Sequence, residues 1–175
     1  MYLIAQIMGF FGTITGVSGI QFKKKSHIMM SVILTNIFFC INFALLEAYS
    51  GAIICFISAV QTLINYLFDR KKMKYPKLLI TSYFIVYIFC GLITFSTFID
   101  IIPVICAILF VITIIQCKEK YFRIFLLVST LLWVYYDVVV GAYTAVIYDI
   151  FLSISTIIAM VRYDIKKKDL DKFNI

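Results

Sequence analysis

Long apolar runs, most of them separated by clusters of basic residues, constrain this chain more than any other feature of its sequence. Each run approaches the roughly 20 apolar residues that an α-helix needs to cross a bilayer. Charged residues make up 14% of the chain and the mean hydropathy is +1.04, whereas about a quarter of a soluble domain is charged. So little polar surface cannot cover a water-soluble globule, and we therefore expect lipid to be the main solvent.

The pattern predicts an all-α membrane protein with seven transmembrane helices. We place the spans at residues 3–21, 28–46, 50–68, 78–98, 101–117, 124–141 and 143–161. All 16 Lys and Arg residues then follow the first, third, fifth or seventh span, while Glu47 and Asp100 lie on the other side. Because basic loops stay in the cytoplasm, we expect the N-terminus outside and the C-terminus in the cytoplasm.

The second half of the chain repeats the first. Residues 45–53 resemble residues 139–147 at an offset of 94, and residues 21–25 resemble residues 116–120 at an offset of 95. Spans one to three therefore return as spans five to seven in the same direction, with span four between them. This is a parallel repeat, as found in some transporters, and it places a cavity between two three-helix bundles. The predicted units are a first repeat at 1–70, a loop and linker helix at 71–99, a second repeat at 100–163 and a basic tail at 164–175.

Polar residues inside the spans follow helical spacing. Polar groups that face lipid without a partner are costly, so we expect these stripes to face inward. They either line one central cavity or join helices through hydrogen bonds. The candidate substrate-binding residues are Asn42, Gln61, Asn65, Trp133, Asp137, Asp149 and Thr156.

Asp137 and Asp149 are the carboxylates within the predicted spans, where a charge costs about 3 kcal/mol on insertion scales. Asp149 lies near the N-terminus of its helix, where the helix dipole favours an acid. Asp137 lies near a C-terminus, where the dipole opposes it, so it is the stronger candidate for a substrate contact or a proton-coupling group. We expect Asp137 to be partly hydrated, protonated or hydrogen-bonded by a tyrosine such as Tyr135 or Tyr136. Trp133, one turn earlier, either stacks on a ring of the solute or packs between helices.

Several short motifs resemble the YgjV family of bacterial inner-membrane proteins. They are Ala5-Gln6 with Gly9, residues 45–52, residues 62–64, residues 133–137, Gly141 and Arg162. The 3+1+3 plan is also similar to that of the SWEET sugar transporters and the PnuC vitamin transporters, which implies passage of a small solute by alternating access. The first span departs from the SWEET pattern because it has no proline, and Gly9 stands roughly where Pro103 stands in the second repeat.

Other classes of function find little support in the sequence. It contains no nucleophile–base pair, phosphate loop or zinc-like cysteine spacing, so we expect neither an enzyme nor a cofactor. The net charge of +7 follows from topology and from attraction to anionic lipid, which argues against nucleic acid. The expected partners are the bilayer and a small solute, and a homo-oligomer remains open. The alternative to a transporter is a membrane protein that binds a ligand or serves as a scaffold without transport.

Overall fold

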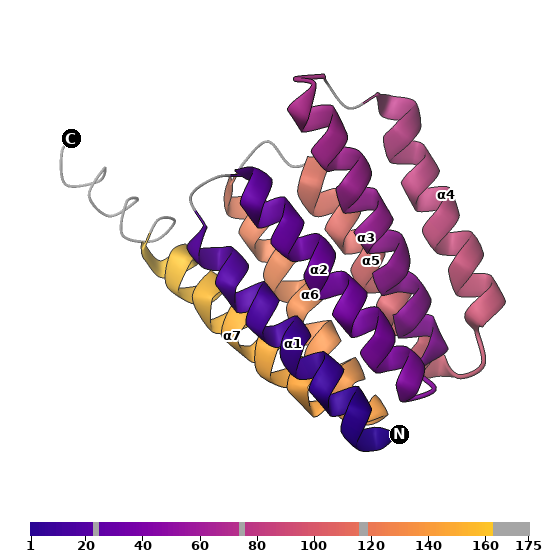
Figure 1. Ribbon diagram of the computed structural model, residues 1–175. Helices are drawn as coiled ribbons and strands as arrows, with labels where there is room; N and C mark the ends of the chain where they lie inside the picture. The colour runs from indigo at the N-terminus through magenta and orange to yellow at the C-terminus, as the bar shows by residue number, and fades with distance from the viewer. Residues whose placement is uncertain (23–24, 74–75, 116–118, 163–175) are drawn as a thin grey trace.

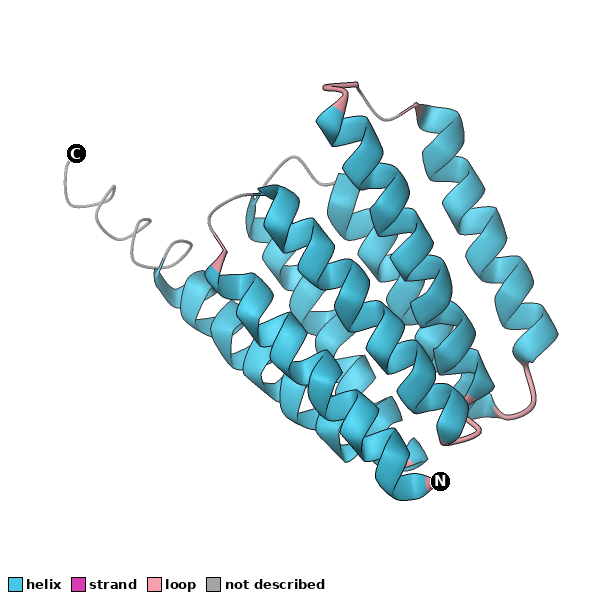
Figure 2. Ribbon diagram, viewed as in Figure 1, coloured by secondary structure: helices cyan, strands magenta, loops and turns pink. Residues whose placement is uncertain are grey.

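The computed structural model describes residues 1–22, 25–73, 76–115 and 119–162, and this part of the chain is helical, without strands (Figures 1 and 2). Six of the helices are long and apolar enough to span a membrane, and the remaining one, α5, is apolar but shorter. The prediction of a seven-helix membrane protein is therefore confirmed. The elements are α1 (Tyr2–Gln21), α2 (Lys25–Leu45), α3 (Tyr49–Arg70), α4 (Lys77–Thr94), the 3-10 helix η1 (Phe98–Asp100), α5 (Ile101–Ile115), α6 (Glu119–Val140) and α7 (Tyr143–Met160).

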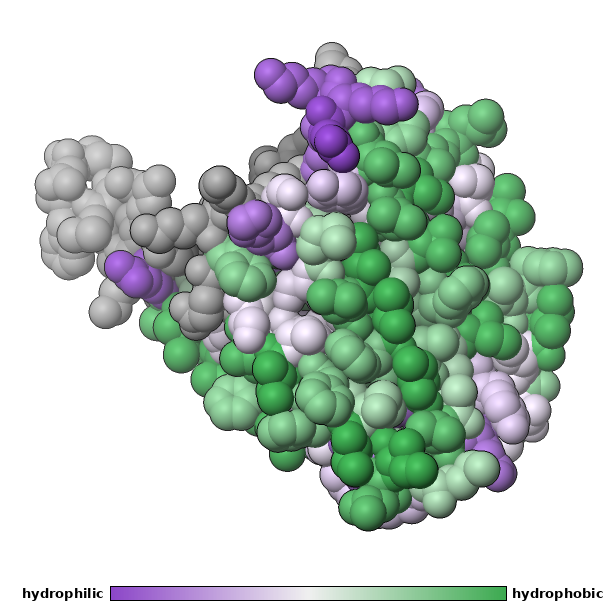
Figure 3. All heavy atoms as spheres, viewed as in Figure 1, coloured by the Kyte–Doolittle hydropathy of each residue, from purple (hydrophilic) through white to green (hydrophobic). Residues whose placement is uncertain are grey.

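Successive helices run in opposite directions (Figure 1). The N-terminus, the turns after α2 and α6 and the loop after α4 therefore lie at one end, which we call the N-terminal face. Helices α1, α3, α5 and α7 finish at the other end, the basic face, where the sequence carries its Lys and Arg clusters. Apolar side chains cover most of the flank between the two faces (Figure 3), as a lipid-facing surface requires.

One helix boundary recurs in the second half of the chain. Helix α3 begins at residue 49 and helix α7 begins at residue 143, which is 94 residues later. Helix α4 has no counterpart in this correspondence and stands between the two sets of three helices.

The turn between the last two helices of each repeat is the same in both copies. Glu47 (φ 61°) and Gly141 (φ 76°) are 94 residues apart and both adopt the left-handed conformation. The residues that follow them donate equivalent backbone hydrogen bonds, from Ala48 N–H to the carbonyl five residues back at 2.9 Å and from Ala142 N–H at 2.8 Å. This is the closure of a helix C-terminus by a left-handed residue. The repeat therefore extends from the hydropathy pattern to individual hydrogen bonds.

The two repeats form a ring. Within each repeat the middle helix packs on its two neighbours, α1 contacts α7, and α3 contacts α5. Helix α4 lies outside this ring against α3 and α5. The ring thus has two contacts between bundles, one through α1 and α7 and the other through α3 and α5.

Helix α4 is shorter than predicted, ending at Thr94 and not near residue 98. The cause is Asp100, whose Oδ2 accepts hydrogen bonds from the backbone N–H groups of Ser96 (3.1 Å) and Thr97 (2.7 Å). These bonds stabilise a non-helical turn that leads into η1. The predicted basic tail at 164–175 lies outside the described residues.

Candidate solute-binding site

A cavity of about 410 Å³ lies inside the ring, with walls from α1, α2, α3, α5, α6 and α7. At one end it reaches Asp137, three residues before the last residue of α6 at the N-terminal face. At the other end it reaches Gly19 and Ile28, close to the basic-face ends of α1 and α2. The volume falls in the range of small-molecule sites, and the long axis runs between the two faces.

The cavity lies on the axis that relates the two repeats, because equivalent residues line it from both sides. Members of each pair differ by 94 in residue number and come from corresponding helices. Pairs that line the cavity include Thr35 with Ser129, Asn36 with Thr130, Phe39 with Trp133, and Ile54 with Tyr148.

The chemistry of the two halves differs at the carboxyls. Asp137 and Asp149 both line the cavity from the second repeat. Their counterparts in the first repeat, Phe43 and Cys55, also line it but carry no charge. The cavity is thus symmetric in shape and one-sided in charge.

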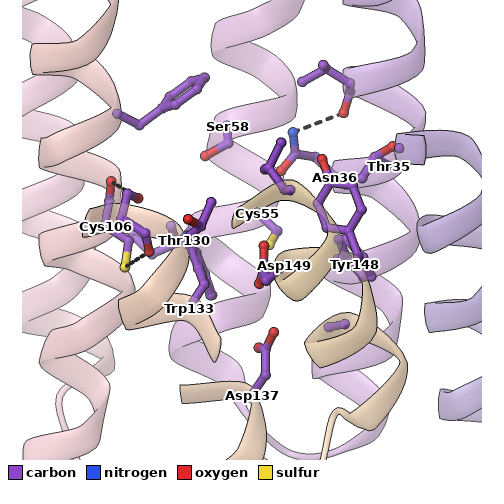
Figure 4. Close-up of a pocket in the computed structure, with 18 of the residues that line it drawn as sticks. Thr35, Asn36, Cys55, Ser58, Cys106, Thr130, Trp133, Asp137, Tyr148 and Asp149 are labelled. Carbon is purple, nitrogen blue, oxygen red and sulfur yellow. Dashed lines mark hydrogen bonds between the residues drawn. The ribbon is translucent and has the colours of Figure 1, made fainter. Parts of the chain in front are cut away.

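The two carboxyls lie next to each other. Asp137 is fully buried and Asp149 is 7% exposed, and both side chains line the same cavity. In Figure 4 the carboxyl of Asp137 points towards Asp149. No N–H or O–H of the described residues donates to either oxygen of Asp137. Its carboxyl is therefore buried without a hydrogen-bond partner in this part of the chain.

The tyrosine beside Asp137 does not supply the hydrogen bond that the sequence suggested. The hydroxyl of Tyr136 lies 2.9 Å from the Ser50 hydroxyl and accepts a hydrogen bond from the Gly51 N–H at 3.0 Å. It therefore joins α6 to α3 and leaves Asp137 facing the cavity.

Trp133 lines the cavity and also packs between helices, while stacking on a ring of the solute stays a prediction. Its ring stacks on Phe43, with centroids 5.8 Å apart and planes 18° from parallel. It also meets the ring of Tyr136 edge-on at 5.6 Å. Aromatic pairs of this kind hold each other in place, which fixes the indole as a rigid wall one helical turn from Asp137.

Gln61 and Asn65 lie apart from the cavity. The hydroxyl of Tyr87 donates to Gln61 Oε1 at 2.5 Å, and the hydroxyl of Tyr83 donates to Asn65 Oδ1 at 3.1 Å. Both tyrosines belong to α4, so these polar side chains attach the linker helix to α3. Their neighbour Ser58, on the same helix, does line the cavity.

Asn42 and Thr156 are also buried outside the cavity lining. Asn42 Nδ2 donates to the Ala5 carbonyl at 2.7 Å and so joins α2 to α1. Thr156 Oγ1 donates to the Leu152 carbonyl of its own helix at 2.8 Å. A direct contact of these two residues with a solute stays a prediction.

Several lining residues were not among the sequence candidates. Cys55, Cys106 and Tyr148 line the cavity. The repeat was the missing signal, because an offset of 94 places Cys55 at the position of Asp149. No group of three His, Cys, Asp or Glu side chains that could hold a metal occurs in the described residues.

Two equivalent sets of hydrogen bonds join the bundles at the N-terminal face, and we call them the clasps. In one, Ser50 Oγ donates to Asp100 Oδ1 at 2.7 Å. In the other, Thr144 Oγ1 donates to Gln6 Oε1 at 3.2 Å. Ser50 and Thr144 are 94 residues apart, as are Gln6 and Asp100. The same contact is therefore made twice around the axis.

The Asp100 clasp carries a charge. Burial raises the pKa of Asp100, but hydrogen bonds from Ser50, Thr97 and Ser96 outweigh that effect and leave the pKa below its ordinary value. The carboxylate of this clasp is thus stabilised in its ionised form.

Comparison with known proteins places the chain in a family. No curated protein and no solved structure matches it. A family model described as bacterial inner membrane protein, Imp-YgjV, matches residues 3–167, which is nearly the whole length. The chain therefore belongs to the Imp-YgjV family of bacterial inner membrane proteins.

Proposed function

We propose that this protein is a transporter or facilitator of a small solute that works by alternating access between its two three-helix bundles. The observation that carries the proposal is the cavity on the axis between two equivalent bundles. Parallel repeats with a solute site at their interface are a common transporter plan. Rocking of one bundle against the other exposes such a site to each face in turn. The proposal involves no catalytic step.

The clasps supply a closed state for one face. Both join the bundles at the N-terminal face, the end at which the cavity reaches Asp137. In the opposite direction the cavity reaches Ile28, which is 37% exposed. We therefore assign this structure to a state that is closed at the N-terminal face. Release of both clasps would open the cavity to that face. With basic loops inside, the N-terminal face is the outer one.

Cys55 offers a direct test, because it is a native thiol in the cavity wall. The other four cysteines are replaced by alanine and the protein is reconstituted in oriented vesicles. A membrane-impermeant maleimide is then added to one side at a time. We expect Cys55 to react from the basic face and also from the N-terminal face. A variant in which Cys55 is also alanine gives the background.

A reversible lock sharpens the test. In the background that retains Cys55, Gln6→Cys with Thr144→Cys places two thiols across one clasp, and oxidation joins the bundles. We expect oxidation to abolish labelling of Cys55 from the N-terminal face and to leave labelling of Cys55 from the basic face unchanged. A reductant should reverse the effect. The single Gln6→Cys variant is the control. If Cys55 in the unlocked protein reacts from only one face under all conditions, alternating access is wrong, and a ligand-binding protein without transport is the better description.

A further inference from the structure

We infer that the solute of this cavity is a small organic cation, held by the Asp137–Asp149 carboxyl pair within aromatic walls. The inference deepens the proposed function, since it names the ligand class of the same site. It rests on that cavity being the solute site. The binding experiment below needs no transport, so the two proposals can fail separately.

The charge of the cavity is the first support. Two acids line it, and among the described residues that line it there is no Lys, Arg or His. An anionic solute would meet the carboxyls with no compensating positive charge, which is costly in a weakly polar interior. A cation meets the opposite situation, because its charge offsets theirs.

The unpartnered state of Asp137 is the second support. Both of its oxygens are buried without a donor among the described residues, although such groups in proteins are nearly always paired. Its helix dipole also opposes a negative charge near that end. The orientation of the side chain into the cavity (Figure 4) identifies a ligand as the group that completes its bonding.

The aromatic walls are the third support. Trp133, Phe43, Phe39 and Tyr148 all line the cavity, and the rings of Phe39 and Tyr148 lie 5.4 Å apart. Aromatic faces attract organic cations through the ring quadrupole, most strongly when solvent is excluded. Carboxyls at one end and aromatic faces around the body match an ammonium group that carries apolar substituents.

The carboxyl pair also predicts competition with protons. Two neighbouring buried carboxyls cannot both ionise readily, so the empty site keeps a proton on one of them, and a bound cation displaces that proton into solvent. The other titratable groups in the walls are Cys55 from α3, Cys106 from α5 and Tyr148 from α7, none of which is cationic. Cation affinity should therefore rise as the pH rises and the pair loses its proton.

The sequence provides the assay, because Trp133 is the one tryptophan in the chain. Its fluorescence reports on the cavity alone. The full-length protein in detergent is titrated with tetraethylammonium, with the uncharged triethylcarbinol and with the anion trimethylacetate, at several pH values. The melting temperature is measured in parallel, since a ligand that binds the folded state raises it. We expect a saturable response to the cation alone, stronger at higher pH.

Substitutions locate the site. Asp137→Asn should weaken tetraethylammonium binding by about tenfold or more, the scale of losing one partner of a buried charged contact, and should flatten its pH dependence. Asp149→Asn is the second variant should the first fail to fold. Glu47→Gln, which removes an exposed carboxylate from the turn after α2, should bind as the wild type. Equal responses to cation and alcohol, a response to pH without any to the cation, or wild-type binding in both Asp variants would each overturn the inference.

Discussion

The bond between Tyr87 and Gln61 allows a quantitative test of how the linker helix is held. Tyr87 is fully buried, and its hydroxyl bonds to Gln61 at 2.5 Å and to Ser58 at 3.1 Å. Gln61 Nε2 is buried without another partner, so Tyr87→Phe strips the amide of its remaining side-chain bond. Two bonds at about 0.6 kcal/mol each, plus about 1 kcal/mol for an unpaired buried amide, give a loss of roughly 2 kcal/mol.

A double-mutant cycle isolates the pair. Tyr87→Phe combined with Gln61→Leu removes both partners, and a pair of apolar replacements is nearly neutral. We therefore expect the double variant to recover roughly 1 kcal/mol relative to Tyr87→Phe, as a coupling energy between contacting residues. Unfolding is followed in mixed micelles by circular dichroism. Tyr135→Phe, at a tyrosine that is 58% exposed, is the matched control and should leave stability unchanged.

The same variants distinguish a structural role of Gln61 from a solute contact. If Gln61 holds α4, Gln61→Leu should change the free energy of unfolding and leave the response to tetraethylammonium intact. The reverse outcome would refute the reasoning, namely unchanged stability in Tyr87→Phe together with lost cation binding in Gln61→Leu.

Three further outcomes are expected. A Cβ at Gly51 would lie 2.8 Å from the hydroxyl and 2.9 Å from the ring of Tyr136, so Gly51→Ala should lower the unfolding free energy by about 1–3 kcal/mol; an unchanged melting curve would contradict the packing. The pKa of Asp100 is lower in the folded protein than its ordinary value of 3.8. Asp100 therefore contributes stability above pH 3.8, and this contribution is lost as the pH falls through the folded pKa. Asp100→Asn should remove that pH-dependent part of the melting temperature. In intact cells without native cysteines, an impermeant maleimide should label Glu47→Cys and spare Lys72→Cys, whereas the opposite pattern would reverse the proposed orientation.

The helices and their boundaries followed closely from the sequence because span length and loop charge are set by the bilayer itself. The deviation in α4 arose from Asp100, whose capping of Ser96 and Thr97 is a local effect within an apolar stretch. A hydropathy pattern is read over many residues and does not register a single capping side chain. The predicted end of the fourth span therefore lay too far along the chain.

The candidate site was predicted in part. Asp137, Asp149 and Trp133 do line one cavity, since a buried acid must face either a partner or an enclosed space. Gln61 and Asn65 shared the expected polar face of α3, but helical spacing cannot say which neighbour that face meets. It meets the tyrosines of α4, a helix that stands outside the repeat and has no counterpart from which its position could be inferred.

The unequal distribution of carboxyls between the repeats explains what a single chain gains over a dimer. Two copies of the first repeat would enclose a pocket with Phe43 and Cys55 on both sides and no acid. Two copies of the second would bring four carboxyls together, because Asp137 and Asp149 would each occur twice. Neither assembly reproduces the observed pair. Covalent linkage through α4 allows the two halves to keep the same arrangement of helices while their cavity residues differ. A nearly symmetric cavity therefore carries its pair of carboxyls on one side only.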